Sequence, residues 1–293
     1  MKRNLTLILF LLCLSIGASL ACNLTNLANA TAVPTEVPAQ VETQVSTVEP
    51  SPTTDSNPQP ADTAVPPTTP PEPDVNVEGV SFSYAPSLAS NVRFEITPRE
   101  DNPDDPEWMH SPELIRFTFE GYPVTEHFHV PALSVFSIDE VIEIAPSVAD
   151  KIDRLKNLLA ARPDSPEPPL PYLLSVPAGQ VIAARIHYLE FKNGSGIVYL
   201  TQFAQDISPV NNYSLFYTFQ GITNDGRWYV TAALPVNHPL LPADSNIENY
   251  DAFAENYENY LADTKTLLES QPAESYTPNL NLLDELFRSL RVK

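Results

Sequence analysis

Cysteine is almost absent from this chain. Its 293 residues include only Cys13 and Cys22, both close to the N-terminus. Without a thiol after residue 22, the rest of the chain can form no internal disulfide bond, bind no metal through thiolates and use no cysteine nucleophile. These absences exclude a disulfide-stapled fold and cysteine-dependent catalysis.

Glycine is also scarce, with eight residues in the whole chain. No glycine-rich loop of the kind that cradles phosphates occurs. Ser195 lies in the string Asn-Gly-Ser-Gly, which lacks the G-x-S-x-G spacing of a nucleophile elbow. The sequence therefore carries no nucleotide-binding signature and no sign of a serine nucleophile.

Basic residues are outnumbered. The chain has 16 Lys and Arg against 37 Asp and Glu, for a net charge of −21. Phosphate backbones and anionic lipid surfaces repel a protein of this charge. We expect no nucleic-acid partner, and any attachment to a membrane must come from a lipid rather than from a basic patch.

Long hydrophobic runs are missing except at the N-terminus. Two basic residues precede the run Leu5–Leu14, which is too short to span a bilayer and is typical of a secretion signal. Small residues then lead to Cys22 in the string Ala-Ser-Leu-Ala-Cys, which resembles the lipobox of bacterial lipoproteins. The resemblance implies a signal peptide over residues 1–21 and a diacylglycerol on Cys22 that anchors the protein in the bilayer, on the extracytoplasmic face of the cell membrane. A plain secreted protein cut near Ala21 is the alternative.

Residues 22–78 have the composition of a tether. They contain eleven prolines between Pro34 and Pro73, no Lys or Arg, and no aromatic residue. Such a segment buries too little apolar surface to offset the entropy of ordering it. We expect a disordered stalk, stiffened by proline, that sets the distance from the membrane. A glycosylated stalk and a wall-spanning spacer are alternatives of the same kind.

Residues 79–293 have the pattern of a single globular domain. Alternating apolar residues predict strands, Asn-Gly and Asp-Gly pairs predict hairpin turns at 193–194 and 225–226, and a 3.6-residue apolar period predicts helices. The order predicts an α+β fold with a mostly antiparallel sheet and helices packed on it. The expected strands are 80–84, 91–96, 114–119, 132–136, 181–191, 197–203, 214–222 and 227–233, and the expected helices are 147–161, 247–269 and 283–290.

Two segments of this domain allow more than one interpretation. The proline-rich loop 163–179 carries several apolar side chains, so it is either packed on the core or functional. The stripe of Tyr250, Tyr257 and Tyr260 has helical spacing and indicates a core-facing surface, with a sugar-binding surface as the alternative.

Short strings in the domain resemble known families. The strings GVSFSY (79–84), RWYVTAALP (227–235) and LFRSLRV (286–292) resemble the PsbP-like family of α/β/α sandwiches. The hairpin that begins YTFQG at Tyr217 is similar to that of uncharacterised bacterial envelope lipoproteins with a Pro/Thr-rich tether. These resemblances imply an envelope location, a sandwich architecture and an accessory role. They imply no catalytic residue and no cofactor.

The histidines of Glu-His-Phe-His (126–129) are the candidate metal ligands. In a strand, His127 and His129 would project from one face about 7 Å apart, which suits two ligands of one zinc ion. His110, His187 or a neighbour of Glu126 would supply a third ligand, and two ordinary surface histidines are the alternative. The acidic segment 101–107 offers oxygen ligands for calcium but lacks EF-hand spacing, which indicates a solvated loop. We favour no metal and predict no cofactor.

Taken together, the sequence favours a lipid-anchored envelope protein whose domain binds or assists rather than catalyses. The partner would be an envelope protein or a glycan, and an apolar or aromatic groove is expected near the loop 163–179. The alternative is a cell-envelope hydrolase that depends on a metal or on a carboxylate pair.

Overall fold

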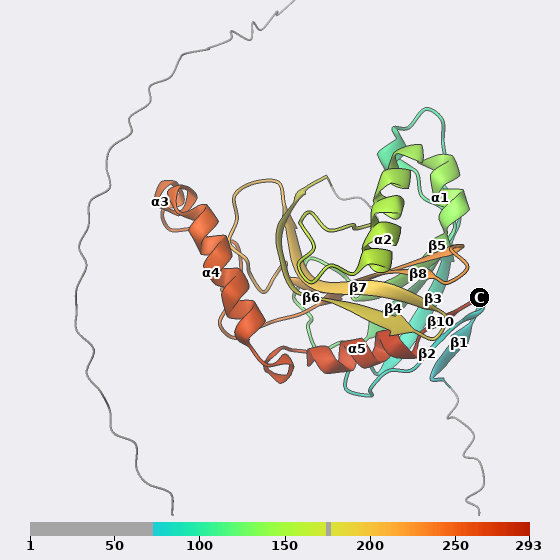
Figure 1. Ribbon diagram of the computed structural model, residues 1–293. Coiled ribbons are helices and arrows are strands. Elements are labelled where there is room, and N and C mark those ends of the chain that lie inside the picture. The colour runs from blue at the N-terminus through green and yellow to red at the C-terminus, as the bar shows by residue number, and fades with distance from the viewer. Residues whose placement is uncertain (1–72, 174–176) are drawn as a thin grey trace, which may run out of the picture. The chain divides into compact units, whose positions relative to one another are not determined.

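The computed structural model describes residues 73–173 and 177–293, which belong to one compact unit (Figure 1). Seven strands form an antiparallel sheet in the order β3-β4-β5-β9-β8-β7-β6, and three short strands form a second sheet in the order β1-β2-β10. The predicted α+β fold with a mostly antiparallel sheet is confirmed. The strands are β1 (Val75–Val77), β2 (Val80–Phe82), β3 (Asn91–Thr97), β4 (Leu114–Glu120), β5 (Ala132–Ser137), β6 (Gly179–Phe191), β7 (Gly194–Ala204), β8 (Phe216–Thr223), β9 (Trp228–Pro235) and β10 (Arg291–Val292).

Helices pack on both faces of the large sheet (Figure 1). One face, here called the α1–α2 face, is covered by α1 (Ile138–Ile144) and α2 (Ala149–Ala161). The opposite face, called the α4–α5 face, is covered by α4 (Tyr257–Ser270), α5 (Leu280–Ser289) and the three-stranded sheet. The short helix α3 (Tyr250–Glu255) precedes α4.

Alternation along β4 shows how the sequence divides its residues between the faces. Ile115, Phe117 and Phe119 are buried in the core of the α4–α5 face. Arg116 and Thr118 lie between them and therefore point to the α1–α2 face, where both are only partly buried. The apolar half of the pattern made the strand predictable from sequence.

The predicted helix over 147–161 is α2, which a 3₁₀ turn at Pro146–Val148 precedes. Ile152 and Leu155 are fully buried, as the apolar period indicates. Helix α1 was not predicted, because its seven residues are too few to show a period. It begins where the Ser137 hydroxyl accepts a hydrogen bond from the Glu140 amide at 3.3 Å.

Both predicted hairpins are present, but the first turn lies one residue earlier than the Asn-Gly pair. Phe191 pairs with Gly194, so the turn is Lys192–Asn193. Gly194 is inside β7, where the Phe191 ring and the Ile222 carbonyl leave no room for a Cβ atom. The Asn193 side chain instead holds the backbone of Val292 in β10.

The N-terminal boundary of the domain corrects the prediction that the tether extends to residue 78. Val75–Val77 form β1, which pairs with β2, and Val75 and Val77 pack against the core of the α4–α5 face. The Asp74 carboxylate accepts a hydrogen bond from the Tyr84 amide at 2.9 Å. The folded part therefore includes residues that composition alone assigned to the tether.

The predicted helix over 247–269 is interrupted at Asn256, which separates α3 from α4. Tyr250 is 51% exposed, so the core-facing interpretation is wrong for this end of the stripe. Tyr257 and Tyr260 are partly buried, and their hydroxyls bond the backbone at Ser208 and Val210 at 3.0 Å. The stripe therefore fastens α4 to the chain that leads into β8.

Candidate functional site

The predicted lipidation site, Cys22, lies outside the described residues, as do the predicted signal peptide and most of the predicted tether. The lipid anchor stays a prediction from sequence. In the part of the chain that the structure describes, no helix combines the length and apolarity needed to cross a bilayer.

His127 and His129 do not form the strand pair that the metal hypothesis required. They lie in the loop between β4 and β5, with ring centroids 5.7 Å apart. The Nδ1 atom of His127 accepts a hydrogen bond from the His129 amide at 2.9 Å, so its Nε2 atom donates to the Leu215 carbonyl at 2.8 Å. Both nitrogens of His127 are thus occupied by the protein itself, which corrects the expectation of two ligands on one face.

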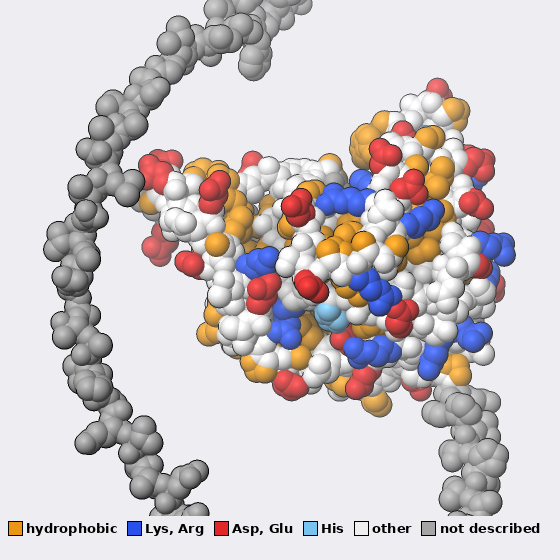
Figure 2. All heavy atoms as spheres, viewed as in Figure 1, with side chains coloured by type: hydrophobic (Ala, Val, Ile, Leu, Met, Phe, Trp, Pro, Cys, Tyr) orange, Lys and Arg blue, Asp and Glu red, His pale blue; other side chains and the backbone are white. Residues whose placement is uncertain are grey.

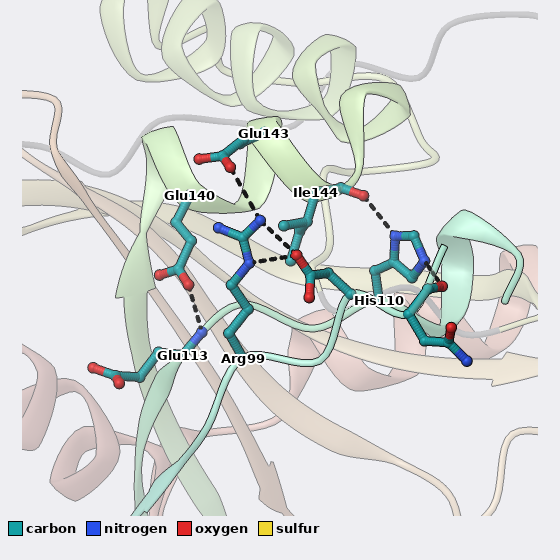
Figure 3. A network of polar contacts seen from close by, with 8 residues as sticks. Arg99, His110, Glu113, Glu140, Glu143 and Ile144 are labelled. Carbon is teal, nitrogen blue, oxygen red and sulfur yellow. Dashed lines mark hydrogen bonds and ion pairs between the residues drawn. The ribbon is translucent and has the colours of Figure 1, made fainter. Parts of the chain in front are cut away.

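His110 and His187, the suggested third ligands, lie elsewhere and have partners of their own. The nitrogens of His110 face the carbonyls of Ile144 at 2.7 Å and Asn102 at 3.0 Å (Figure 3). Within residues 73–173 and 177–293, no group of three or more His, Cys, Asp or Glu side chains is placed to hold a metal ion.

The acidic segment 101–107 is fastened to α1 and to the 3₁₀ turn that precedes α2. Arg99 binds Asp101 at 2.7 Å and Glu143 at 3.0 Å (Figure 3). The Ser147 amide donates to Glu107 at 2.6 Å. This last bond lowers the pKa of Glu107. The Asp101 and Glu107 carboxylates thus help to attach this segment, which is otherwise largely exposed, like the solvated loop that the sequence indicated.

An aromatic cleft opens on the α1–α2 face, next to the loop 163–179. It consists of two adjoining hollows of about 300 and 430 Å³ that share Phe128 and His129. These sizes suit a small ligand or the end of a larger one. The residues lining the two hollows are Arg116, Phe128, His129, Val130, Ala132, Ser134, Tyr172, Leu173, Pro177, Ala178, Phe203, Ala204, Gln205, Ser214, Thr231 and Ala233.

Aromatic rings form the walls of this cleft. The His129 ring packs on Phe216 with centroids 4.2 Å apart and on Phe128 at 5.0 Å. Tyr172 packs on Phe203 at 5.0 Å. Phe128 is 67% exposed, which is unusual for a phenylalanine already in contact with other rings. The walls thus present apolar surface to solvent.

The His129 imidazole, which forms part of the cleft wall, is uncharged at pH 7. Burial against the rings, together with the nearby His127, lowers the pKa of His129 to about 4. No hydrogen bond of the described residues involves its ring nitrogens. A neutral imidazole can both donate to and accept from a ligand in the cleft.

The floor of the cleft is polar. Arg116, Ser134 and Thr231 lie directly opposite one another on β4, β5 and β9, so their side chains form one row across the sheet. The row continues into Gln220 of β8, whose Nε2 atom donates to the Thr231 hydroxyl at 2.8 Å. Thr231 accepts this bond and keeps its own proton for another partner.

The Arg116 side chain has neither a hydrogen bond nor an ion pair among the described residues. It lies partly buried in the floor of the cleft, whereas Arg93, Arg99 and Arg162 each bind a carboxylate. Its positive charge lowers the pKa of Tyr172, although burial dominates and raises that pKa to about 12. The Tyr172 hydroxyl likewise has no hydrogen-bond partner among these residues.

Unlike Arg116, several charged side chains around β6, α2, α4 and α5 have partners of opposite charge. Figure 2 shows Lys and Arg side chains interspersed with Asp and Glu there. Arg162 pairs with Glu190, and Lys265 lies 3.8 Å from Glu269. Pairing of this kind leaves little net field, in contrast to the floor of the aromatic cleft.

A second polar cluster lies under α5. The buried Asp284 carboxylate accepts hydrogen bonds from Tyr217 at 2.7 Å, from His187 at 2.9 Å and from Arg288 at 3.4 Å. The second nitrogen of His187 faces the Arg185 carbonyl at 3.2 Å. This cluster joins α5 to β6 and β8.

The sequence predicted a groove near the loop 163–179, but it did not indicate that Arg116 lines this groove. The available signal was the alternation of β4, β5 and β9, in which Arg116, Ser134 and Thr231 interrupt apolar strands of the sheet interior. No family model, curated protein or solved structure matches this chain.

Proposed function

We propose that this chain is a lipid-anchored envelope protein whose α+β domain binds a small ligand, or the end of a larger one, in the aromatic cleft. The observation that carries the proposal is the exposed ring of Phe128, which with His129 joins two hollows of ligand size. The anchor rests on the sequence around Cys22 alone. The accessory role implied by the PsbP-like resemblance stays a prediction.

The hydrolase alternative lacks comparable support. His187 with Asp284 is the nearest approach to a catalytic pair, but that carboxylate is buried under α5 and bound by Tyr217 and Arg288. Both nitrogens of His187 have oxygen partners, and no hydroxyl of the described residues bonds either of them. The cleft has apolar walls and a polar floor, an arrangement that suits ligand binding better than hydrolysis.

The cleft is tested with N-phenyl-1-naphthylamine, a neutral fluorescent probe, and the mature chain (22–293) carrying Cys22→Ser, which removes only the lipid attachment point. Phe128→Ser should weaken probe binding about fivefold or more, as expected for the loss of a ring that touches the ligand. Trp108→Ser is the matched control, because Trp108 is 70% exposed, close to the 67% of Phe128, but lies outside the cleft. Equal losses in both variants would show nonspecific adsorption and contradict the proposal.

The anchor is tested separately by metabolic labelling with a fatty acid. Cys22→Ala should abolish both the label and the processing of the precursor, because no other cysteine follows the signal. Cys13→Ala should leave both unchanged, since Cys13 lies within the predicted signal peptide. Labelling that persists in Cys22→Ala would exclude the lipoprotein interpretation.

A further inference from the structure

We propose that Arg116 is the anchor for a carboxylate on the ligand, and that the ligand carries this carboxylate on a ring that packs between the aromatic walls of the cleft. This inference rests on the proposed function, because it names the chemistry of the ligand that the cleft takes. It assigns an anionic ligand to a protein of net charge −21.

The charge of the cleft supports this assignment. The residues that line it include one arginine and no aspartate or glutamate. A partly buried guanidinium without a partner loses part of its hydration, and an incoming anion would restore that interaction. Arginine binds carboxylates through two parallel hydrogen bonds, which favours this planar group over a spherical anion.

The row of side chains on the floor supplies further donors. Adjacent strands are about 4.8 Å apart, so a group bound at Arg116 lies within reach of the Ser134 hydroxyl on the next strand. The Ser134 hydroxyl has no hydrogen-bond partner among the described residues, and the Thr231 hydroxyl beyond it has a proton to donate. Tyr172, whose hydroxyl also has no hydrogen-bond partner among the described residues, lines the same hollow.

The walls define the rest of the ligand. Phe128, His129 and Tyr172 surround the hollow above Arg116, and the neutral His129 ring adds no charge there. Rings pack against one another at centroid distances of about 4.5–7 Å, and the Phe128 and His129 rings already lie 5.0 Å apart. An aromatic acid and an acidic sugar share this chemistry, a carboxylate attached to a ring.

Glu95 provides an internal control for the charge that the ligand carries at Arg116. It lies opposite Arg116 on the edge strand β3, and no ion pair joins the two side chains. Its exposed carboxylate would repel an anion at Arg116. Glu95→Gln should therefore tighten the binding of a carboxylate and leave the binding of its uncharged amide unchanged.

The experiment is calorimetric titration of the mature chain carrying Cys22→Ser at constant ionic strength. The probes are benzoate and its uncharged analogue benzamide, and glucuronate and its uncharged analogue glucuronamide. Arg116→Gln should weaken binding of the better carboxylate about tenfold and leave its amide unchanged, with Arg116→Lys intermediate because it keeps the charge but loses the planar fork. Arg93→Gln, which alters an exposed arginine outside the cleft, should change neither. The pair that shows the difference distinguishes an aromatic acid from a sugar acid.

The outcomes separate this inference from the proposed function. If each carboxylate and its amide bind equally, or if Arg116→Gln weakens both alike, the assignment of Arg116 is wrong. If the neutral naphthylamine probe depends on Phe128 but no carboxylate binds, the cleft hypothesis stands and only this inference fails. If inorganic phosphate competes as well as the carboxylates do, the site is a general anion site and the carboxylate assignment is overturned. Unchanged melting temperatures of the variants exclude misfolding as the cause.

Discussion

The two faces of the seven-stranded sheet are built from the same strands but are covered to different extents. On the α4–α5 face, Phe117, Leu133 and Ala232 from three adjacent strands are buried to 0–1% exposure. Their sequence neighbours Arg116, Ser134 and Thr231 point to the α1–α2 face, where no helix covers them and the cleft lies. Helices α1 and α2 cover only the other end of this face.

This difference between the two faces shows that one strand can contribute to stability with one set of residues and to binding with the alternate set. Every second residue builds a closed core, and the residues between them are free to be polar where no helix packs on the sheet. Changes on the α4–α5 face should therefore alter stability, and changes at the open end of the α1–α2 face should alter binding.

The largest expected effect is the loss of a ring from the α4–α5 face. Phe287 is fully buried and stacks on Phe219 with centroids 4.7 Å apart. Phe287→Ala should lower the free energy of unfolding by about 3–5 kcal/mol, measured by urea denaturation. Phe128→Ala, at the open face, should stay within about 0.5 kcal/mol of wild type. Similar losses in both would contradict the division of roles between the faces.

Removal of the Asp284 carboxylate should have the next largest effect. Asp284→Ala leaves the Tyr217 hydroxyl buried without its acceptor, which should cost about 2–3 kcal/mol of unfolding free energy. Tyr217→Phe removes the donor instead and should cost less. If Asp284→Ala left stability unchanged, the cluster under α5 would not join the helix to the sheet.

Deletion of β1 should weaken the cover of the α4–α5 face to a smaller extent. A mature chain that begins at Gly79 lacks Val75 and Val77, which are only partly buried, and should lose about 1–2 kcal/mol relative to a chain that begins at Pro73. Thermal unfolding of the two chains gives the comparison. Equal melting temperatures would show that the stable domain begins at residue 79, as composition indicated.

Two histidines near the α1–α2 face should give opposite pH dependences of stability. The pKa of His129 is lowered to about 4, so the unfolded chain binds the proton first and stability falls between pH 6.5 and 4. The pKa of His110 is raised by the Ile144 carbonyl, so its contribution is present below pH 6.5 and is lost as pH rises through the folded-state value. His129→Phe should remove the first slope, which is at most about 1.4 kcal/mol per pH unit, and His110→Gln should remove the second. Denaturant titrations at several pH values would detect a slope of the wrong sign.

The smallest expected effect on stability is that of Arg116. Because the Arg116 side chain has no hydrogen bond or ion pair among the described residues, Arg116→Met should change the free energy of unfolding by less than about 0.5 kcal/mol or increase it. Arg99→Met is the comparison, since Arg99 binds both Asp101 and Glu143. A larger loss in Arg116→Met than in Arg99→Met would mean that Arg116 serves the fold.

Local patterns predicted most of the fold, and long-range contacts explain the rest. The apolar alternation of β4 and the period of α2 are visible in the sequence because burial acts on each residue locally. Val75 lies in a strand because β1 pairs with β2, which in turn pairs with β10 near residue 292. A local pattern cannot show a pairing between segments so far apart in the sequence. His127 was placed in a strand, but its ring is held by Leu215, 88 residues away. Arg116 was missed because sequence cannot show which part of a sheet the helices leave open.

The most direct test of the account is chemical-shift mapping of the isotope-labelled mature chain, carrying Cys22→Ser, during titration with benzoate and glucuronate. The account predicts that the largest shifts fall on the amides of Arg116, Ser134 and Thr231 and on the loop around Phe128. Residues of α4 and α5, such as Leu268 and Phe287, are separated from the ligand by the sheet and should shift least. Shifts concentrated on the α4–α5 face or at His187, or spread evenly over the surface, would contradict the claim that the open end of the α1–α2 face is the binding site.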